Sequence, residues 1–496
     1  MNLFKNNVII DDNKITEANS LKTNSLNKIA TININGKNQV FDNSFFIKGF
    51  IDSHAHIMHT GKQLNGLDLS ECKSDDECIE KCINYKNRQG EWLVARGWNQ
   101  ELWEEKKYPS KEKLDKFFPD TPVFLTRIDG HAYWMNSKAF EVCDIDKNTI
   151  SPKGGDILLD KNGELSGIIL DNASELVYKH IPELSYNDKK QYILDAIDEF
   201  MKHGITEIHD MDVDIDLIDI YKELERENKL KIKIISYIRG FDNKYLEKHI
   251  IPYKSKMLNI IGLKFYMDGA IGSRGAALHE PYNDDLNNKG ILLEEVDNFY
   301  QKIKTGVENN WQIATHAIGD YAMSLVLDVY ERIRNEFPNA HLRIEHAQMI
   351  KREDLIRLKE NNIFCSVQPL FAKSDENMVF ERIGDRVNNS YLWKTFIDNK
   401  IIIGASSDAP IESISVIESL KVLTDTDISW QKSEKLTFEE AIDLYTKNNM
   451  ILSGSINNHL NNKDIDEKFT LLEGKENDLN TWKIKGIIAN GCLHII

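Results

Sequence analysis

The stretch "GFIDSHAH", residues 49–56, follows the apolar run Phe45–Ile47 and ends in two histidines one residue apart. In a β-strand, side chains alternate between the two faces, so residues i and i+2 point the same way. His54 and His56 would therefore project together from the end of a strand, where two imidazoles can bind one metal ion. Two polar residues where a strand meets its loop are the alternative, and this short motif alone leaves both open.

The chain after residue 200 alternates short apolar segments with amphipathic helical ones, such as 321–337 and 352–362. This alternation predicts a parallel sheet with crossover helices. With residues 49–56, the predicted strands number eight, which favours a closed (β/α)8 TIM-like barrel whose active site lies at the strand C-terminal ends. A doubly wound open sheet is the alternative, although no Gly-rich phosphate loop follows any of the strands. The other seven predicted strands are 204–212, 231–240, 262–269, 311–320, 341–348, 362–370 and 401–410.

Two further parts of the chain depart from this rhythm. Residues 62–200 separate the first predicted strand from the second, and they carry strand and helix patterns of their own. So long a segment predicts an inserted subdomain over the barrel mouth. The two ends, 1–48 and 453–496, are β-rich and predict one small composite β-sandwich, which leaves 49–452 as the barrel domain.

Composition limits the classes of partner. With 62 basic and 79 acidic residues, the net charge is −17, which argues against nucleic acid or an anionic membrane as a partner. No segment approaches the ~20 apolar residues that span a bilayer, and the N-terminus lacks the apolar core of a signal peptide. We therefore expect a cytoplasmic protein with a small-molecule substrate, and we leave a homo-oligomer open. Cys72, Cys78 and Cys82 lack the second ligand pair of a zinc knuckle, which favours free thiols.

Side chains of metal-ligand type recur where the predicted barrel strands end. Taken alone, a histidine is more often structural, and an aspartate before Ala-Pro often caps a turn. Because the strand ends of a barrel share one rim, the set together predicts one functional site. Its members are His54 and His56 on the first strand, Lys264 on the fourth, His316 on the fifth, His346 on the sixth and Asp408 on the eighth.

The ordered set of motifs resembles the amidohydrolase superfamily of metal-dependent hydrolases. Within it, the chain is most similar to amidohydrolase family 3, a branch that includes N-substituted formamide deformylase. The resemblance covers nearly the whole chain, with a departure at Asn99, where the family usually has Asp. The matching segments are "GFIDSHAH", "RIDGHAYWMNSKAF", "KFYMDGAIGSRGAAL", "HAIGDYA", "RIEHAQ" and "SSDAPIES".

The resemblance implies one or two divalent ions per chain, with zinc as the expected metal. A protonated lysine has donors only and cannot bind a cation, so the resemblance implies that Lys264 is carboxylated where two metals are bridged. A plain Lys264 paired with a carboxylate such as Asp268 is the alternative. Asp408 would bind metal and take the proton of the attacking water, with His131 as the next candidate for that role. The implied metal ligands are His54, His56, Lys264, His316, His346 and Asp408.

Further residues are candidates for substrate binding, although structural pairing explains each nearly as well. By resemblance, the "RIDGHAYW" segment of the insertion would close the barrel mouth and contact substrate through Arg127, Asp129, His131 and Trp134. Arg274 could hold an anionic or carbonyl group with its guanidinium fork. Gln368, at the end of the seventh predicted strand, would line the pocket.

These observations together predict a metal-dependent hydrolase that cleaves a C–N bond other than a peptide bond. A deaminase or an esterase could use the same site on the same barrel. A non-catalytic assembly protein is the remaining alternative, but such a protein would have little reason to retain the whole ligand set.

Overall fold

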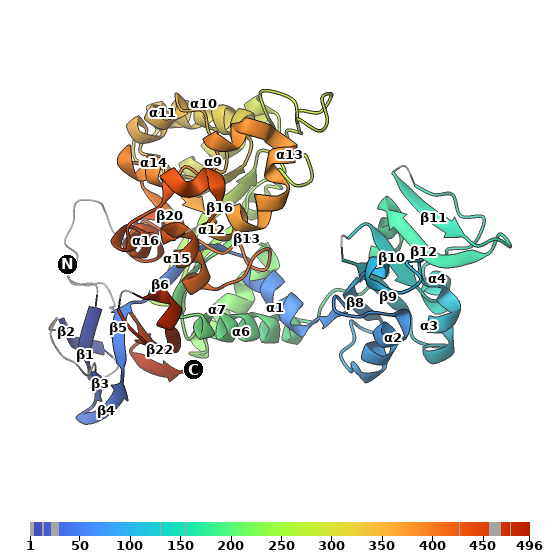
Figure 1. Ribbon diagram of the computed structural model, residues 1–496, viewed down its shortest axis with the longest axis horizontal. Coiled ribbons are helices and arrows are strands. Elements are labelled where there is room, and N and C mark those ends of the chain that lie inside the picture. The colour runs from blue at the N-terminus through green and yellow to red at the C-terminus, as the bar shows by residue number, and fades with distance from the viewer. Residues whose placement is uncertain are drawn as a thin grey trace. The chain divides into compact units, whose positions relative to one another are not determined.

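The computed structural model describes residues 4–11, 14–20, 29–128, 130–152, 154–425, 427–455, 468–476 and 478–496. These form two compact units (Figure 1). The larger unit comprises Met1–Thr60 and Ile193–Ile496, and the smaller comprises Gly61–Tyr192. No helix among the described residues is long and apolar enough to cross a membrane.

The larger unit contains a (β/α)8 TIM-like barrel. Its eight strands form consecutive parallel pairs from β6 to β20. The remaining seam between β20 and β6 is bridged by Asp408 N–H donating to His54 O (2.7 Å) and by Ser53 Oγ donating to Ala405 O (3.1 Å). This confirms the barrel and excludes the open sheet. The strands are β6 (Phe50–Ala55), β13 (Ile205–Val213), β14 (Lys233–Arg239), β16 (Leu258–Tyr266), β17 (Gln312–Ala317), β18 (Leu342–His346), β19 (Phe364–Val367) and β20 (Ile403–Ala405).

Amphipathic helices surround the strands. In α10 (Asp320–Glu336), the apolar residues recur every three to four positions and are buried against the barrel, as the 3.6-residue period requires. The start of α16 (Phe438–Tyr445) is fixed by a capping box between Thr437 and Glu440. The other main helices are α6 (Tyr186–Lys202), α7 (Ile218–Arg226), α9 (Val296–Glu308), α11 (Asp354–Glu360), α12 (Pro369–Ser374), α13 (Val379–Ile383), α14 (Trp393–Asp398), α15 (Val416–Thr424) and α17 (Lys447–Leu452).

Both ends of the chain contribute to one separate eight-stranded sheet. Within it, β5 and β21 are antiparallel neighbours, with Phe46 opposite Leu471. Alternate residues such as Val8 and Ile10 are buried in a small core of its own. Residues 456–467, within the predicted 453–496 segment, lie outside the described residues. The strands are β1 (Phe4–Asp11), β2 (Lys14–Ser20), β3 (Ile29–Ile34), β4 (Lys37–Asp42), β5 (Ser44–Lys48), β21 (Phe469–Glu473), β22 (Lys483–Ala489) and β23 (Cys492–Ile495).

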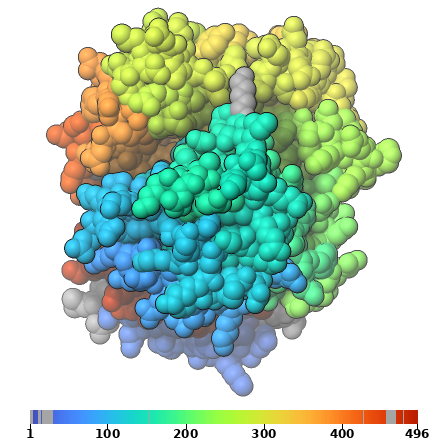
Figure 2. All heavy atoms as spheres, turned by 90° about the vertical axis from the view of Figure 1, so that its right-hand side faces the viewer, coloured from blue at the N-terminus to red at the C-terminus, as the bar shows by residue number. Residues whose placement is uncertain are grey.

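The smaller unit is a six-stranded sheet with an apolar core on each face. Figure 2 draws the atoms of this unit as spheres, coloured from blue to teal. The predicted insertion, residues 62–200, includes most of α6 in sequence. The second half of α6 belongs to the larger unit, where Ile197 and Phe200 pack into the barrel core. Cys72, Cys78 and Cys82 are buried free thiols in this unit. Its elements are β7 (Leu67–Asp68), α2 (Asp75–Asn84), β8 (Leu93–Trp98), α3 (Lys111–Phe117), β9 (Val123–Arg127), β10 (Ala132–Met135), α4 (Ser137–Val142), β11 (Gly155–Leu159), β12 (Leu165–Asp171) and α5 (Glu175–Tyr178).

Candidate metal centre

The C-terminal ends of β6, β18 and β20 bring three ligand-type side chains together. One ligand atom each from His54, His346 and Asp408 lies within 4.8 Å of the others, and all three residues are buried. His56 directly follows β6, and its Nε2 is 3.1 Å from Asp408 Oδ1. The Nε2 of His54 is 3.4 Å from the same oxygen. The two histidines of the opening motif therefore face one carboxylate.

Two further histidine contacts extend the cluster across the rim. The imidazole of His346 is 4.4 Å from that of His316 and 4.9 Å from that of His54, between ring centroids. Strict alternation along β18 would send Glu345 and His346 to opposite faces. His346 instead has φ of +72°, which turns the chain at the strand end, and Asp408 has φ of +58°. Such left-handed conformations of non-glycine residues are concentrated at functional sites.

The hydrogen bonds of His54 and His346 leave one nitrogen of each ring for a cation. His56 Nδ1 is 2.9 Å from Met211 O, and His346 Nδ1 is 2.8 Å from Gln368 Oε1. His54 Nδ1 is 2.6 Å from Glu345 Oε2. Because carbonyl and carboxylate oxygens only accept, Nδ1 of His54 and of His346 carries the proton and their Nε2 atoms present a lone pair, whereas His56 faces an acceptor at both nitrogens, Met211 O and Asp408 Oδ1. Metal-binding histidines are held by the same kind of second contact, so this donor set fits a divalent cation.

Burial favours the neutral form of His54, His316 and His346, which is the form that binds a metal. Burial, assisted by Lys264, lowers the pKa of His316 to about 3 and that of His54 well below its usual value. At His56 the burial is outweighed by the hydrogen bond with Asp408, which raises the pKa.

Lys264 lies on β16 with its side chain fully buried. Its Nζ is 3.5 Å from His54 Nε2 and 4.9 Å from the centroid of the Tyr266 ring. Burial lowers the pKa of Lys264 to about 8, which increases the fraction of neutral amine, the form from which a carbamate is made. In the described structure the expected alternative partner, Asp268, accepts backbone N–H groups of Ala277, Ile318 and Gly319 instead of pairing with Lys264.

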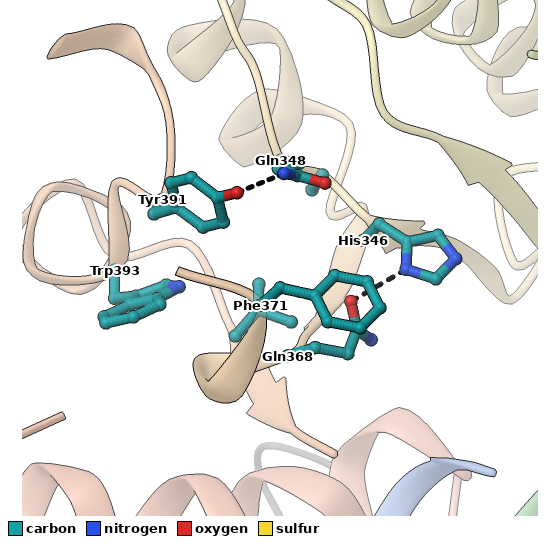
Figure 3. Close-up of a pocket in the computed structure, with 8 residues that line it drawn as sticks. His346, Gln348, Gln368, Phe371, Tyr391 and Trp393 are labelled. Atoms are coloured by element: carbon teal, nitrogen blue, oxygen red, sulfur yellow. Dashed lines mark hydrogen bonds between the residues drawn. The ribbon is translucent and has the colours of Figure 1, made fainter. Parts of the chain in front are cut away.

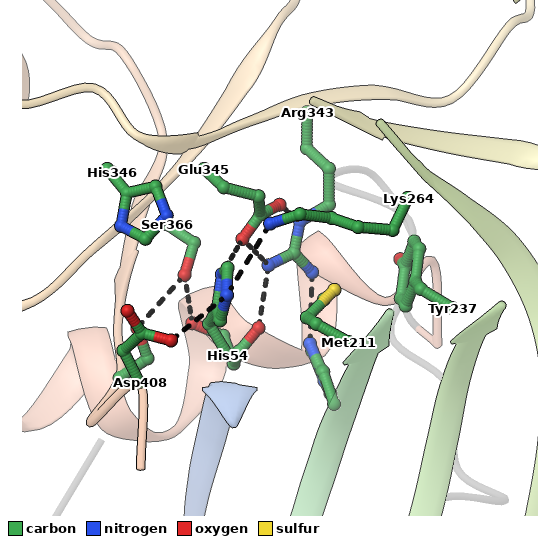
Figure 4. A network of polar contacts seen from close by, with 12 residues as sticks. His54, Met211, Tyr237, Lys264, Arg343, Glu345, His346, Ser366 and Asp408 are labelled. Carbon is green, nitrogen blue, oxygen red and sulfur yellow. Dashed lines mark hydrogen bonds and ion pairs between the residues drawn. The ribbon is translucent and has the colours of Figure 1, made fainter. Parts of the chain in front are cut away.

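Three residues of this centre were missed by the sequence reasoning, although a signal was present. Arg343 and Glu345 are fully buried in β18 and contact each other, and Glu345 also contacts His54 (Figure 4). Asp52 accepts the N–H of His54 (3.1 Å) and both the N–H and the hydroxyl of Ser407. Like His54 and His56, these residues sit at period-two positions of otherwise apolar strands, so the argument applied to the histidines would have found them.

Gln368 is the N-cap residue of α12, and its side chain holds His346 as described above. It also lines a small cavity of about 10 Å³ beside Phe371, Tyr391 and Trp393 (Figure 3). A space of this size holds about one water molecule. Gln368 therefore contacts His346, a candidate metal ligand. The cavity that Gln368 lines is too small for a substrate.

Arg274 is bound by an acidic partner. Its Nε and Nη2 donate to the two carboxylate oxygens of Asp284, at 3.1 and 2.7 Å. The guanidinium of Arg274, which the sequence suggested for substrate binding, is therefore paired with Asp284.

The substrate-contact candidates of the insertion are placed within the smaller unit. Arg127 Nε donates to Gln100 Oε1 (2.7 Å), and His131 Nδ1 lies 2.8 Å from Asp171 Oδ1 on the surface. Trp134 is fully buried in that unit's core, where its indole N–H donates to Ser110 O (3.0 Å). Asp129 lies outside the described residues.

Known proteins resemble the chain over most of its length. The sequence model of the protein family described as "Amidohydrolase family" matches residues 46–455. YtcJ of Bacillus subtilis (strain 168) is 32% identical over 470 residues, which cover 89% of this chain and 87% of YtcJ. N-substituted formamide deformylase of Arthrobacter pascens is 23% identical over 445 residues, covering 82% and 79% of the two chains. The crystal structure of a metal-dependent hydrolase from Pyrococcus furiosus has a TM-score of 0.74 and 26% identity, covering 91% of this chain and 94% of that one.

Proposed function

The chain belongs to the amidohydrolase family, and from this premise we propose that it cleaves an amide-type C–N bond, other than a peptide bond, in a small molecule. The proposal rests above all on the cluster of His54, His346 and Asp408 at the barrel rim. The net charge of −17 supports a small-molecule substrate over nucleic acid, and we propose a cytoplasmic location on the same ground.

The proposed cofactor is zinc, with one or two ions per chain. The inward Nε2 atoms and the Asp408 carboxylate supply the nitrogen and oxygen ligands that zinc prefers. When bound, such an ion polarises a substrate carbonyl and lowers the pKa of a coordinated water towards ~7. With two ions, a carboxylated Lys264 would bridge them. The residues proposed to hold the metal are His54, His56, Lys264, His316, His346 and Asp408.

Asp408 is the proposed proton acceptor and donor. Its carboxylate lies at the open end of the strands, and Oδ1 faces Nε2 of both His54 and His56. In the proposed reaction a water oxygen bonds to the carbonyl carbon while its proton passes to Asp408. The C–N bond then breaks, and the proton moves from Asp408 to the leaving nitrogen, as a positioned carboxylate can provide.

The choice of a C–N bond is supported by a relative. The Arthrobacter pascens protein is named for removing a formyl group from N-substituted formamides, and its match covers 82% of this chain. An N-formyl or N-acyl small molecule is therefore the first substrate class to test.

A substrate panel tests the proposal. Zinc-, manganese- and cobalt-loaded protein is assayed on N-formyl and N-acyl amines, carboxylic esters and ring amines, with metal-stripped protein as the control. We expect amine release from the amides in a metal-dependent manner. Hydrolysis of esters alone, or ammonia release from ring amines alone, would replace the amide assignment. No turnover with any metal and no bound metal would reject it.

A further inference from the structure

A line of buried charged and polar side chains runs inside the barrel beneath His54. Every residue of this line that lies on a barrel strand has 2% or less of its surface exposed, which is unusual for charged residues. It crosses the barrel interior, because β18 and β6 are not neighbours in the sheet. Its members are, in order of contact, Lys468, Glu207, His209, Arg343, Glu345 and His54.

The centre of this line is a two-point pair. Arg343 Nε and Nη2 donate to the two oxygens of Glu345, at 2.5 and 2.9 Å, and Nη2 also donates to Ser53 O (2.7 Å). A planar guanidinium fixes the plane of a carboxylate that it binds at both oxygens. Glu345 is thereby held with Oε2 at 2.6 Å from His54 Nδ1. Figure 4 shows these side chains together.

Arg343 sets the direction of its hydrogen bond to His209. A guanidinium has donors only, so its Nη1 donates to His209 Nδ1 at 3.1 Å. The proton of His209 is then on Nε2, which lies 3.4 Å from Glu207 Oε1 without forming a hydrogen bond to it. On the other side, the Glu345 carboxylate can only accept, so the proton of His54 is on Nδ1 and its Nε2 carries the lone pair.

We propose that Glu345, oriented by Arg343, is a positioning residue for the metal ligand His54. It fixes the tautomer and the ring plane that present Nε2 to the cation, and its charge strengthens His54 as a ligand. The next residue of the same strand, His346, lies in the cation cluster itself, so β18 both supplies one ligand and orients another. This inference rests on the proposed metal site.

If the Arg343–Glu345 pair had a structural role alone, its loss would lower the stability of the fold and leave the metal affinity unchanged. Glu345→Gln separates the two roles. Either orientation of the new amide puts its NH2 group against a donor, on Arg343 or on His54, and the negative charge is lost. We expect zinc affinity to fall by about 10- to 100-fold, the range found when groups that hold a ligand are removed.

Glu207→Gln is the matched control. Glu207 is also buried in the same line, and its charged neighbours among the described residues are Lys468, Lys233 and His209, none of which is a proposed metal ligand. This variant should unfold more easily than wild type and bind zinc with unchanged affinity. Affinity is measured on the full chain by competition with a chelator, and stability by thermal unfolding of the metal-free protein.

The outcomes are distinct. A wild-type chain that binds no zinc would reject the proposed metal site. A zinc-binding wild type together with a folded Glu345→Gln of equal affinity would overturn the positioning role, as would an equal loss of affinity in both variants.

If Glu345→Gln does not fold, Glu345→Asp keeps the charge but withdraws its oxygens by one methylene, and it should bind zinc more weakly. Wild-type zinc affinity in Glu345→Asp would overturn the proposal. In the wild-type metal-free protein, ¹⁵N NMR of labelled histidine should find the His54 proton on Nδ1, and a proton on Nε2 would overturn it independently.

Discussion

Asp52 holds Ser407 at two points, accepting its backbone N–H at 3.1 Å and its hydroxyl at 2.6 Å. The same carboxylate accepts the N–H of His54 at 3.1 Å. The segment that carries Asp408 is therefore tied to the strand that carries His54, across the seam of the barrel. Two ligand-type side chains that are more than 350 residues apart in the sequence are thus held in one fixed arrangement.

Asp408→Asn should abolish turnover and leave the fold intact. The amide keeps the shape of the carboxylate, but it cannot accept the proton of water and it removes a negative charge beside the proposed cation. General-base catalysis contributes ~10²–10⁴-fold, so kcat should fall at least that far. Metal occupancy is measured beside the rate. Nearly normal activity of a metal-loaded variant would contradict this role. His131 would then be the next candidate for the proton acceptor.

Metal removal should lower the unfolding temperature. A ligand that binds only the folded state stabilises it by about 2.7 kcal/mol at a concentration 100-fold above its Kd. Chelation should therefore lower the Tm, and added zinc should restore it. His54→Ala should lose the zinc-dependent shift, whereas His279→Ala should retain it, since His279 lies near Ser324 and belongs to no metal-binding group found among the described residues. Equal shifts in both variants would place the metal elsewhere.

Asn449→Ala should weaken the barrel seam. The buried Asn449 side chain donates to Ile51 O (2.6 Å) and to Ala405 O (2.8 Å), which belong to the two strands on either side of the seam. Loss of a buried hydrogen bond that leaves an acceptor unsatisfied costs about 1–3 kcal/mol, and Ala405 O loses less because it also accepts the Ser53 hydroxyl. Chemical denaturation should show this loss. The neighbouring Asn448→Ala, which removes a single bond to Ile403 O, should lose less. An unchanged free energy of unfolding for Asn449→Ala would refute the account.

Acid should destabilise the protein partly through His341. Burial lowers the pKa of His341 to about 4, below its usual 6.5, while its Nε2 lies 2.8 Å from Leu452 O. Between these two values the unfolded chain binds a proton that the folded chain does not. The contribution is therefore complete above pH 6.5 and is lost as the pH falls towards 4. His341→Gln should show a smaller stability difference between pH 7.5 and pH 5 than wild type, measured on metal-free protein.

Thiol labelling should distinguish one cysteine from five. Cys492 is exposed, whereas the other cysteines are buried and unpaired. Burial raises the pKa of the Cys82 and Cys143 thiols to about 12, which suppresses the reactive thiolate. One thiol per folded chain should react quickly at neutral pH and the rest only after unfolding. Cys492→Ser should remove the fast phase, and its persistence would show that a buried cysteine becomes accessible in the native state.

The barrel was predictable because its information is local. Each strand is a short apolar run followed by a helix with a 3.6-residue period, and eight such units admit few arrangements. The rim cluster followed from strand ends meeting at one edge. In contrast, the turn that brings His346 beside His54 depends on a φ of +72°, which nothing in the residue type requires. Tertiary context imposes that conformation.

Residue type was also ambiguous for several substrate candidates. Trp134 and Arg274 have side chains suited to binding, but one fills a core and the other is held by Asp284. A sequence cannot distinguish an indole that packs inside a unit from one that meets a ligand, because both are apolar with one donor. The Arg343–Glu345 pair was not predicted, because charged residues are rarely expected inside a barrel.

The sheet built from both chain ends orders the events of synthesis. Phe50 N–H donates to Thr470 Oγ1, 420 residues later, and β5 has β21 as a neighbour. A ribosome delivers β5 and β6 early. β5 then has β1 as one neighbour and β6 gains β13, but their other edges wait for β21 and for the seam residues after β20, which emerge near the end of synthesis. Contacts of such long sequence separation slow folding, because the loop entropy is lost before the pairing is gained. The nascent chain therefore carries an unprotected strand edge for most of translation, and this is the stage at which a chaperone has most to cover.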